Sequence, residues 1–532
     1  MRLKALPFVL LLLALAAPAA QANPQGMLSI MMDDDLLLYR GDDVRDESLK
    51  RMKALGADTV RVTVLWNVVA QNAKFDRRGK KRRNFKAENP KTYPRSNWDR
   101  YDRLVKAGKT LGITVYFNVT GPGPRWAHKK PPKRLRALRR TYKPKVAEFK
   151  KYVKALGKRY DGTYVDENDG KRVLPAVRFW SIWNEPNQPG WLTPQYERRG
   201  SKVVPWSPVM YRELFYAGRS ALQGTGHDGD IILVGETAPL GSGRQNPKSP
   251  IRPKRFIREL FCVDANLKRL TGANAAKRQC SYLEKFQGLA KKFGFTAWAH
   301  HPYTKKLPPT RRDSEGDSIT MANVGELATL LDRVGERTSL IPKAGNTTMM
   351  TEFGYETEPP DPFSGVSLEK QAEYINEGDY IAYRESSVLA NTQFLLRDVE
   401  PDRRAKKNTK RYWFTYQSGL QFADGRPKPA ATAYRLPFVV TGQGVDSVGR
   451  LGVRFWGWLR FLGPNTQTEV TLQYKPIGGQ DFSTIGEPVK VTNSFGFFEA
   501  QRSIPDAGTW RAVWTNPVTG TPVTSREVEY GG

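Results

Sequence analysis

The sequence contains little cysteine and, beyond its first residues, no long apolar run. Its two cysteines, Cys262 and Cys280, form no CxxC pair and no Cys/His cluster, so we expect no metal site. No stretch after the N-terminal segment is long and apolar enough to span a bilayer. No GxGxxG or phosphate-binding loop follows a predicted strand, and we therefore expect no cofactor.

The first 22 residues have the layout of a secretory signal peptide. A basic start is followed by an apolar stretch over residues 6–17 and by a small-residue cleavage site at 20–22. We expect cleavage before Asn23 and a secreted, extracellular protein, with an uncleaved membrane anchor as the alternative. In an oxidising compartment we expect a disulfide between Cys262 and Cys280, and closing a loop of that size is worth about 3 kcal/mol.

The charge is strongly positive. There are 85 Lys and Arg residues against 53 Asp and Glu, a formal net charge of +32, which favours anionic surroundings such as nucleic acid, acidic polysaccharide or a charged envelope. Two segments are especially basic: residues 76–95 hold nine Lys/Arg and two acids, and residues 125–145 hold ten and no acid. Either these segments attract an anionic glycan or they form a solvated basic surface.

Strand-like and helix-like segments alternate over most of the chain. We predict strands at residues 27–32, 59–66, 113–120, 176–183, 231–235, 296–301, 347–352 and 388–396. The segment 97–112 has a clear helical pattern, with Gly112 as its C-terminal stop. Eight strand–helix units in one order predict a parallel sheet closed into a (β/α)8 TIM barrel over residues 23–437, with an open doubly wound sheet as the alternative.

The pattern changes after residue 437. Short alternating runs separated by Gly- and Pro-containing turns replace the helical patterns. They predict a small C-terminal all-β, immunoglobulin-like sandwich over residues 438–532. Trp456, Trp458 and Trp510 could contact sugar there, but they alternate as core residues do. We therefore expect a structural or accessory role for this domain.

Two glutamates stand at the ends of predicted strands, where parallel barrels place their active sites. Glu185 follows the fourth strand in "FWSIWNEPNQPGW", and Glu352 ends the seventh in "TTMMTEFGYET". For Glu185 alone, an exposed turn residue is the alternative. Two carboxyl groups facing each other suit glycoside hydrolysis, in which one protonates the leaving oxygen and the other meets the developing positive charge.

Four features in this order resemble glycoside hydrolase clan A, the retaining TIM-barrel glycosidases that include families 5 and 39. They are Asn184-Glu185 before a proline, Glu352 in "TEFG", His301-Pro302-Tyr303, and Arg61 in "VRVTVLW". The resemblance extends over residues 27–437.

The resemblance implies a role for each matching residue. Glu185 would be the general acid/base and Glu352 the nucleophile. Asn184 would hold the sugar hydroxyl beside the reacting carbon, a turn amide being the alternative. Arg61 and Tyr303 would keep Glu352 ionised, and His301 would support the site or merely pack. The neighbouring His300 is expected to point into the barrel wall.

The sequence departs from the clan pattern in two places. Asn118 stands where family 5 often has a histidine, and the tryptophan common on the eighth strand is not evident. Three other tryptophans follow predicted strands and could stack on sugar rings or simply pack: Trp66, Trp126 and Trp191.

We therefore expect a retaining glycosidase that hydrolyses O-glycosyl compounds. It would act as a monomer on a polysaccharide or oligosaccharide, and the charge suggests an acidic or cell-envelope glycan. One alternative is a non-catalytic carbohydrate-binding or envelope-associated barrel. A nucleic-acid binder is suggested by charge alone, and none of the usual recognition motifs is present, so we expect no nucleic-acid partner.

Overall fold

The computed structural model describes residues 26–170, 172–283, 297–445, 451–460, 466–504, 507–517 and 519–530. The predicted signal peptide and the first residue of the predicted strand 296–301 lie outside the described residues. Across those ranges, no helix combines the length and the apolar character that a membrane span requires.

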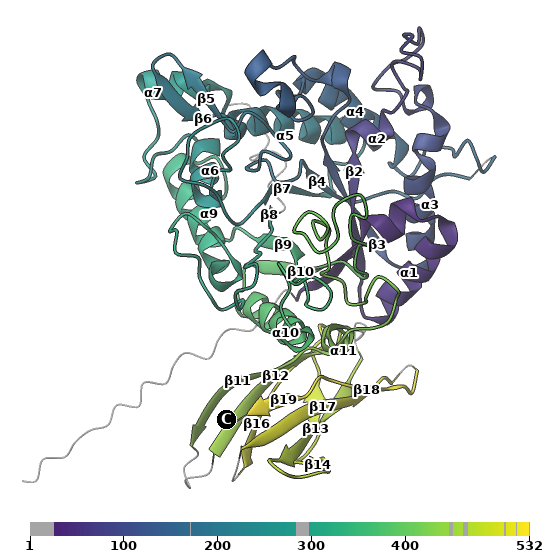
Figure 1. Cartoon of the computed structure of the whole chain (residues 1–532), viewed down its shortest axis with the longest axis vertical. Coiled ribbons are helices and arrows are strands. Elements are labelled where there is room, and N and C mark those ends of the chain that lie inside the picture. Colours follow the sequence, from purple (N-terminus) through teal and green to yellow (C-terminus); the bar gives the residue numbers. More distant parts are fainter. Residues whose placement is uncertain are drawn as a thin grey trace, which may run out of the picture.

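Eight described strands pair in parallel into a closed barrel (Figure 1). In chain order they are β1 (Leu28–Met32), β2 (Thr59–Leu65), β3 (Thr114–Thr120), β4 (Phe179–Ile182), β7 (Ile231–Thr237), β8 (Ala297–His300), β9 (Thr348–Phe353) and β10 (Val388–Phe394). Every predicted strand overlaps one of them, which confirms the TIM barrel. The largest differences are at three strands: β4 begins three residues later than predicted, β7 continues two residues further, and β10 ends two residues earlier.

Helices pack around the outside of the barrel (Figure 1). The main ones are α1 (Asp42–Ala54), α3 (Asp99–Leu111), α4 (Val146–Arg159), α5 (Ser207–Gln223), α6 (Pro253–Leu260), α9 (Gly325–Thr338) and α10 (Leu368–Arg384). Shorter elements are α2 (Trp66–Val69), α7 (Gly272–Lys277), α11 (Pro429–Arg435) and the hairpin of β5 (Tyr196–Arg199) and β6 (Lys202–Pro205). Gly112 ends α3 in the left-handed conformation, as predicted.

The C-terminal residues form two antiparallel sheets. One contains β11 (Phe438–Val445), β12 (Leu451–Trp458) and β16 (Phe497–Ile504). The other contains β13 (Thr468–Pro476), β14 (Ser483–Thr484), β15 (Val489–Val491), β17 (Gly508–Thr515), β18 (Pro522–Thr524) and β19 (Val528–Tyr530). Leu472, Phe455 and Trp510 pack together between them, so the predicted β-sandwich is confirmed.

The sandwich packs against the side of the barrel, next to α10 and α11, and reaches the start of β1 (Figure 1). Arg460 pairs with Asp379 of α10 at 2.5 Å and donates to the Ser29 hydroxyl at the start of β1. Trp456 packs against Tyr383 of α10. Because the three candidate sugar-binding tryptophans of the sandwich are buried, the structure supports their packing role.

The predicted disulfide between Cys262 and Cys280 is present. It links the segment after α6 to the segment after α7, both on the outside of the barrel.

Candidate active site

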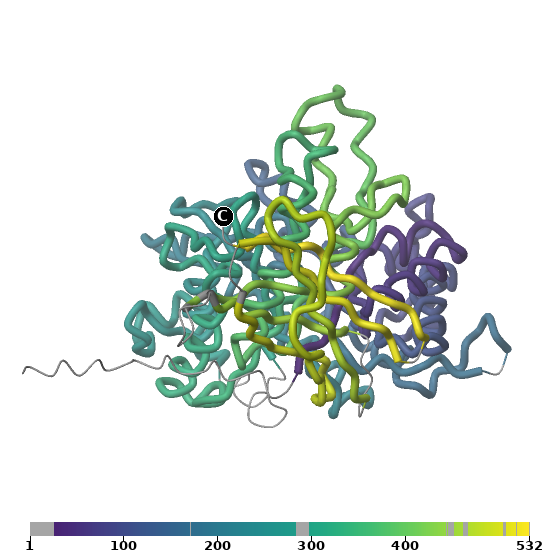
Figure 2. The backbone as a smooth tube through the Cα atoms, turned by 90° about the horizontal axis from the view of Figure 1, so that it is seen from below, coloured from purple at the N-terminus to yellow at the C-terminus, as the bar shows by residue number. Residues whose placement is uncertain are grey.

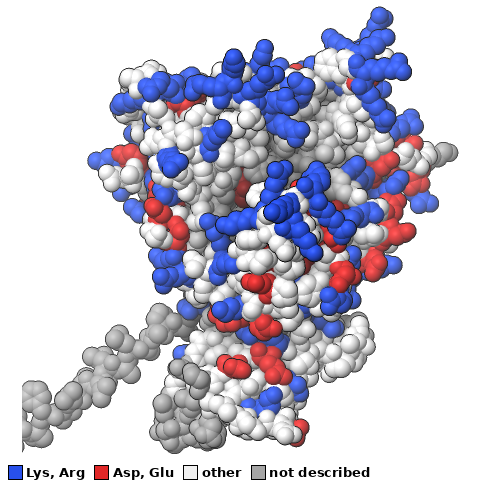
Figure 3. Space-filling model, in the orientation of Figure 1, with Lys and Arg blue, Asp and Glu red and all other residues white. Residues whose placement is uncertain are grey.

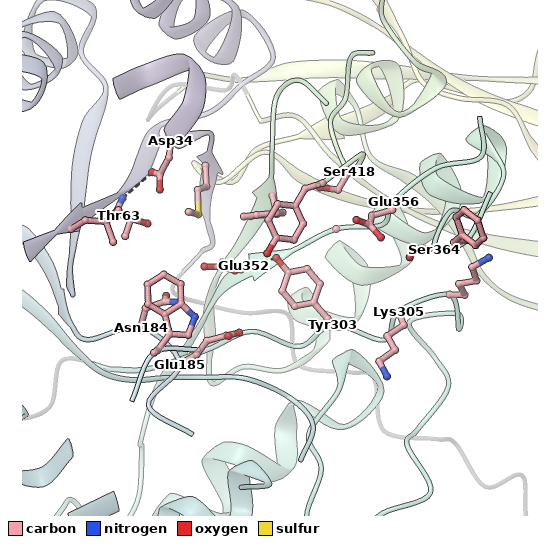
Figure 4. A pocket seen from close by; sticks show the side chains of 18 residues that line it. Asp34, Thr63, Asn184, Glu185, Tyr303, Lys305, Glu352, Glu356, Ser364 and Ser418 are labelled. Atoms are coloured by element: carbon pink, nitrogen blue, oxygen red, sulfur yellow. Dashed lines mark hydrogen bonds between the residues drawn. The ribbon is translucent and has the colours of Figure 1, made fainter. Parts of the chain in front are cut away.

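A cavity of about 760 Å³ lies at the carboxyl ends of the barrel strands. Glu185, Glu352, Asn184, Tyr303 and Trp191, all named from the sequence, contribute to its lining. Figure 4 shows Glu185 and Glu352 on its floor, with the Tyr303 ring beside them. The barrel thus brings together residues that are up to 168 positions apart, between Asn184 and Glu352.

The backbone after β4 turns sharply to present Glu185. Trp183 and Glu185 have positive φ angles of 71° and 36°, a conformation that bulky residues rarely adopt. Two main-chain bonds hold it: the Trp183 amide donates to Val119, and the Glu185 amide donates to Glu236, both within 2.9 Å. Such strain at a cavity is typical of functional sites.

Glu352 is more buried than Glu185, and hydrogen-bond donors surround its carboxylate. The Arg61 guanidinium donates to its Oε1 at 3.0 Å, and the Tyr303 hydroxyl donates to its Oε2 at 3.2 Å. Burial raises the pKa of Glu352, while the charges of His301 and Arg61 act in the opposite direction.

His301 lies between three carboxylates. Its Nδ1 is 3.0 Å from Glu185 Oε1 and 3.5 Å from Glu352 Oε2, and its Nε2 is 2.7 Å from Glu236 Oε2. Burial alone would favour the neutral ring, but these carboxylates raise the pKa of His301 to about 10. The ring is therefore an imidazolium at neutral pH, and both of its nitrogens donate.

His300 behaves differently, as expected from its opposite direction on the strand. It is fully buried in the barrel wall, between the Thr237 hydroxyl at 2.9 Å and the Ile319 carbonyl at 3.0 Å. Burial lowers the pKa of His300 to about 3.

Glu236 is a third glutamate beneath the cavity, and the sequence reasoning missed it. Its carboxylate is fully buried and accepts hydrogen bonds from Ser181, Thr351, Tyr116 and Arg61, as well as from His301. Burial opposes ionisation, but the charge of Arg61 and the donated hydrogen bonds hold the pKa of Glu236 below its usual range.

A bulge in β7 explains why Glu236 points inward. Gly235 pairs with Ala299 and Thr237 pairs with His300, so Glu236 is an extra residue with a φ of 48°. The prediction ended this strand at Gly235. A glutamate at or just beyond the end of a predicted strand was the available signal, as it was for Glu185 and Glu352.

Asn184 and Asn118 occupy different positions. Arg61 donates to Asn184 Oδ1 at 2.8 Å, which orients this amide at the cavity edge. Asn118 is fully buried below it, where its amide donates to the Ser181 hydroxyl at 2.7 Å. Asn118 therefore supports the buried cluster rather than the cavity surface.

Of the three candidate sugar-stacking tryptophans of the barrel, Trp191 lines the cavity. Trp66 does not, because the chain enters α2 directly after β2 and turns this ring into the core, where it stacks on Tyr152 at 5.5 Å. Trp126 is half-buried, with its ring edge-on to Trp66 and the Lys74 ammonium 4.6 Å from its centre. The expectation that Trp66 and Trp126 offer faces to a sugar in the cavity is therefore not supported.

Two further carboxyl groups line the cavity, Asp34 and Glu356 (Figure 4). Burial raises the pKa of Asp34 to about 6, although the Thr63 amide donates to it at 2.9 Å. Burial and the nearby charge of Asp361 raise the pKa of Glu356 to about 7. Both groups can exchange hydrogen bonds with sugar hydroxyls.

Glu185, His301 and Glu352 bring three potential metal-ligand atoms within 4.8 Å of one another. Both ring nitrogens of His301 already lie within hydrogen-bond distance of carboxylate oxygens, Glu185 Oε1 at 3.0 Å and Glu236 Oε2 at 2.7 Å. The arrangement therefore fits a hydrogen-bonded cluster of carboxylates and cations better than a metal site.

Neither basic segment singled out in the sequence contributes to the cavity lining. Residues from 125 to 139 instead line a separate groove of about 870 Å³. The cations that line the cavity are Lys305 and Lys306, which follow β8.

No protein-family model matches the chain, and no curated protein matches its sequence. Among solved structures, the chain is similar to a family 39 glycoside hydrolase from the gut symbiont Bacteroides cellulosilyticus WH2. The TM-score is 0.50 at 13% identity, over 90% of this chain and 81% of that one.

Two other similar structures have lower TM-scores. GH5_18 from Streptomyces cattleya in complex with GlcNAc gives 0.44 at 16% identity, over 78% of this chain and 79% of that one. A hyperthermophilic beta-glucosidase from Pyrococcus furiosus gives 0.43 at 13% identity, over 78% and 95%. The structural neighbours are glycoside hydrolases, as the resemblance implied. At 13% identity, the likeness to the family 39 enzyme supports the fold alone.

Proposed function

We propose that the protein is a retaining glycoside hydrolase that cleaves O-glycosidic bonds of a polysaccharide by double displacement. One observation carries the proposal: a carboxylate oxygen of Glu185 and one of Glu352 lie within 4.8 Å of each other on the cavity floor. Retaining glycosidases hold their two carboxyl groups about 5–5.5 Å apart, whereas inverting enzymes need about 6.5–9.5 Å to admit a water molecule.

The charges around the pair support a division of roles. Three carboxylates, those of Glu185, Glu236 and Glu352, face two cations, Arg61 and the His301 imidazolium. Arg61 donates to Glu352 at 3.0 Å and Tyr303 donates to it at 3.2 Å. A positive charge and a hydrogen-bond donor beside Glu352 favour the carboxylate form that a nucleophile needs.

Glu185 is then the general acid that protonates the leaving oxygen, and Glu352 is the nucleophile that attacks the anomeric carbon. In the second step Glu185 accepts a proton from water, which releases the sugar from Glu352. Asn184 holds the hydroxyl beside the reacting carbon, and the Trp191 ring provides an apolar face for a sugar. Both residues line the cavity.

We also propose that the substrate is an acidic or cell-envelope glycan and that the enzyme acts outside the cell. The net charge of +32 and the two lysines of the cavity lining support an anionic substrate. The disulfide between Cys262 and Cys280 supports an oxidising compartment.

A hydrolysis screen against neutral and acidic polysaccharides tests the proposal, with Glu352→Ala and Glu185→Gln as inactive variants. Glu336→Gln is the matched control, because Glu336 is exposed on α9 and does not line the cavity. We expect release of sugars by the wild type and the control, and loss of nearly all turnover in the two site variants. Full activity in either site variant, with its fold intact, would contradict the assignment.

A further inference from the structure

A second hollow lies beside the cavity, along the segment that follows β10. It measures about 700 Å³, and its lining includes Arg403, Arg404, Arg411 and Phe414. Thr415 lies between Phe414, which lines this hollow, and Tyr416, which lines the catalytic cavity. Consecutive residues of one segment, 414–416, therefore line the two spaces.

The segment forms a loop that is held by internal hydrogen bonds and projects beyond the rest of the backbone (Figure 2, green). At its base, the buried Lys428 ammonium binds Asp398 at 2.7 Å and the Thr357 hydroxyl at 2.8 Å. Farther out, main-chain bonds cross the loop from Val399 to Tyr416 and from Asp402 to Tyr412, both at 2.8 Å. We define the outer loop as residues 399–418.

The outer loop is strongly cationic. It carries six Lys/Arg residues and two acids. Within the described part of the chain, two of the six cations pair with a carboxylate: Arg403 with Glu400 at 3.1 Å and Arg404 with Asp402 at 2.8 Å. Figure 3 shows these cations gathered over the middle of the face, below the row of Lys and Arg along its upper rim. The excess charge favours an anionic ligand.

Aromatic rings accompany these cations. Phe414 is 87% exposed and Tyr416 is 56% exposed, which is unusual for rings of this size. An exposed ring beside a hollow offers a face on which a sugar can stack. Rings and cations together suit either an anionic glycan or a nucleic acid.

The proposed function decides between these ligands. Glu400 and Asp402 also line the hollow, and each pairs with an arginine of the outer loop. The same groups can accept hydrogen bonds from sugar hydroxyls. Under the proposed function, the catalytic cavity binds a glycan, so a glycan is the ligand expected in the neighbouring hollow as well.

We propose that the outer loop forms a subsite for an anionic sugar unit of the glycan whose scissile bond lies over Glu185 and Glu352. Phe414 stacks on this unit, and Arg403, Arg404 and Arg411 bind its carboxylate or sulfate group. The inference rests on the proposed function for the identity of the ligand as a glycan.

Binding to immobilised polymers tests the subsite. The measurement uses the full chain carrying Glu352→Gln, so that no polymer is cleaved, at 0.15 M salt, about the physiological ionic strength. The probes are polygalacturonate for carboxylate, dextran sulfate for sulfate, uncharged dextran, and duplex DNA as competitor. The test variants are Arg403→Gln/Arg404→Gln/Arg411→Gln and, separately, Phe414→Ala. The matched control is Lys129→Gln/Lys130→Gln/Lys133→Gln, which removes the same charge from the other basic groove.

We expect binding to at least one anionic polymer and not to dextran. Both test variants should weaken it at least tenfold, and the control should change it less than twofold. The inference is overturned if no anionic polymer binds, if the control weakens binding as much as the arginine variant, or if DNA competes as well as the bound polymer. Unchanged thermal unfolding of the variants, all at exposed positions, excludes misfolding as the cause.

The hydrolysis screen is independent of this measurement. Binding through the outer loop without hydrolysis of any polymer would contradict the proposed reaction and leave the subsite standing. If a polymer is hydrolysed but binds the loop variants as tightly as the unmodified loop, the result would contradict the subsite and leave the proposed reaction standing.

Discussion

Replacing Glu236 by glutamine removes one charge from a fully buried cluster while nearly preserving the size of the side chain. The carboxylate pairs with Arg61 at 3.2 Å and with His301 at 2.7 Å, and neither cation is exposed to solvent. Removing one partner of a buried ion pair costs about 3–5 kcal/mol, because the other charge stays buried. We expect Glu236→Gln to lose about this much free energy of unfolding at pH 6.

The loss depends on pH through His301. Its pKa is raised from 6.5 to about 10 in the folded protein, a shift worth about 5 kcal/mol over all its partners. A raised histidine pKa stabilises the fold fully below pH 6.5, and this contribution is lost as the pH rises through about 10. The difference in free energy of unfolding between wild type and Glu236→Gln should therefore decrease as the pH rises from 6.5 to about 10.

Two assays check this reasoning. Denaturant unfolding at a series of pH values gives the free energies, with the exposed Glu336→Gln as a control that should change stability by less than about 0.5 kcal/mol. Proton NMR then follows the His301 ring, which can be assigned by comparison with His301→Gln because the chain has four histidines. Two results would refute the ion pairing of Glu236 with His301 and Arg61. One is a wild-type His301 that titrates near pH 6.5, and the other is a Glu236→Gln variant as stable as the wild type at pH 6.

Other perturbations separate packing from binding. Trp66→Ala should lower the free energy of unfolding by about 3–5 kcal/mol, because the ring is fully buried. Trp191→Ala should raise KM with little change in melting temperature, because this ring lines the cavity. The reverse pattern would contradict the placement of the two rings. Cys262→Ser/Cys280→Ser should lower stability by about 3 kcal/mol, and wild type treated with reductant should match it in a melting curve. Arg460→Met leaves the buried Asp379 carboxylate without its ion-pair partner and should lower the free energy of unfolding by about 3–5 kcal/mol, measured by denaturant titration. An unchanged denaturation midpoint would show that this pair does not hold the sandwich to the barrel.

The barrel could be predicted because each strand and its following helix have distinct hydrophobic periods, and residues at strand ends must then converge. That reasoning identified Glu185 and Glu352, which line one cavity although they are distant in the chain. It extended to His301 and Tyr303, whose spacing after β8 places one beside the carboxylates and the other at the cavity wall.

The directions of the Glu236 and Trp66 side chains could not be predicted, because they depend on local backbone geometry that the alternation of strand and helix patterns does not encode. Glu236 lies at a bulge, which turns an extra residue inward, so a strand pattern ending at Gly235 could not show its direction. The sequence pattern predicts Trp66 at the end of a strand, but a helical turn begins at that position and buries its ring.

The basic segments illustrate the same limit at longer range. Charge density along the sequence drew attention to residues 76–95 and 125–145, yet the cavity lining contains neither. The outer loop carries fewer cations, and its place beside the cavity follows from the barrel closing β10 against β1 and β9. Proximity to the site, rather than local charge density, distinguishes the two cases.

The central claim is that Glu185 and Glu352 act by double displacement, and the anomeric configuration of the first-formed product tests it most directly. Proton NMR of a substrate found in the hydrolysis screen, recorded during the first minutes, reports this configuration before mutarotation. The account predicts that the product keeps the configuration of the bond that was cleaved. A product of inverted configuration would contradict it, because inversion requires room for a water molecule between the second carboxylate and the anomeric carbon, and the carboxylate oxygens of Glu185 and Glu352 lie within 4.8 Å of each other.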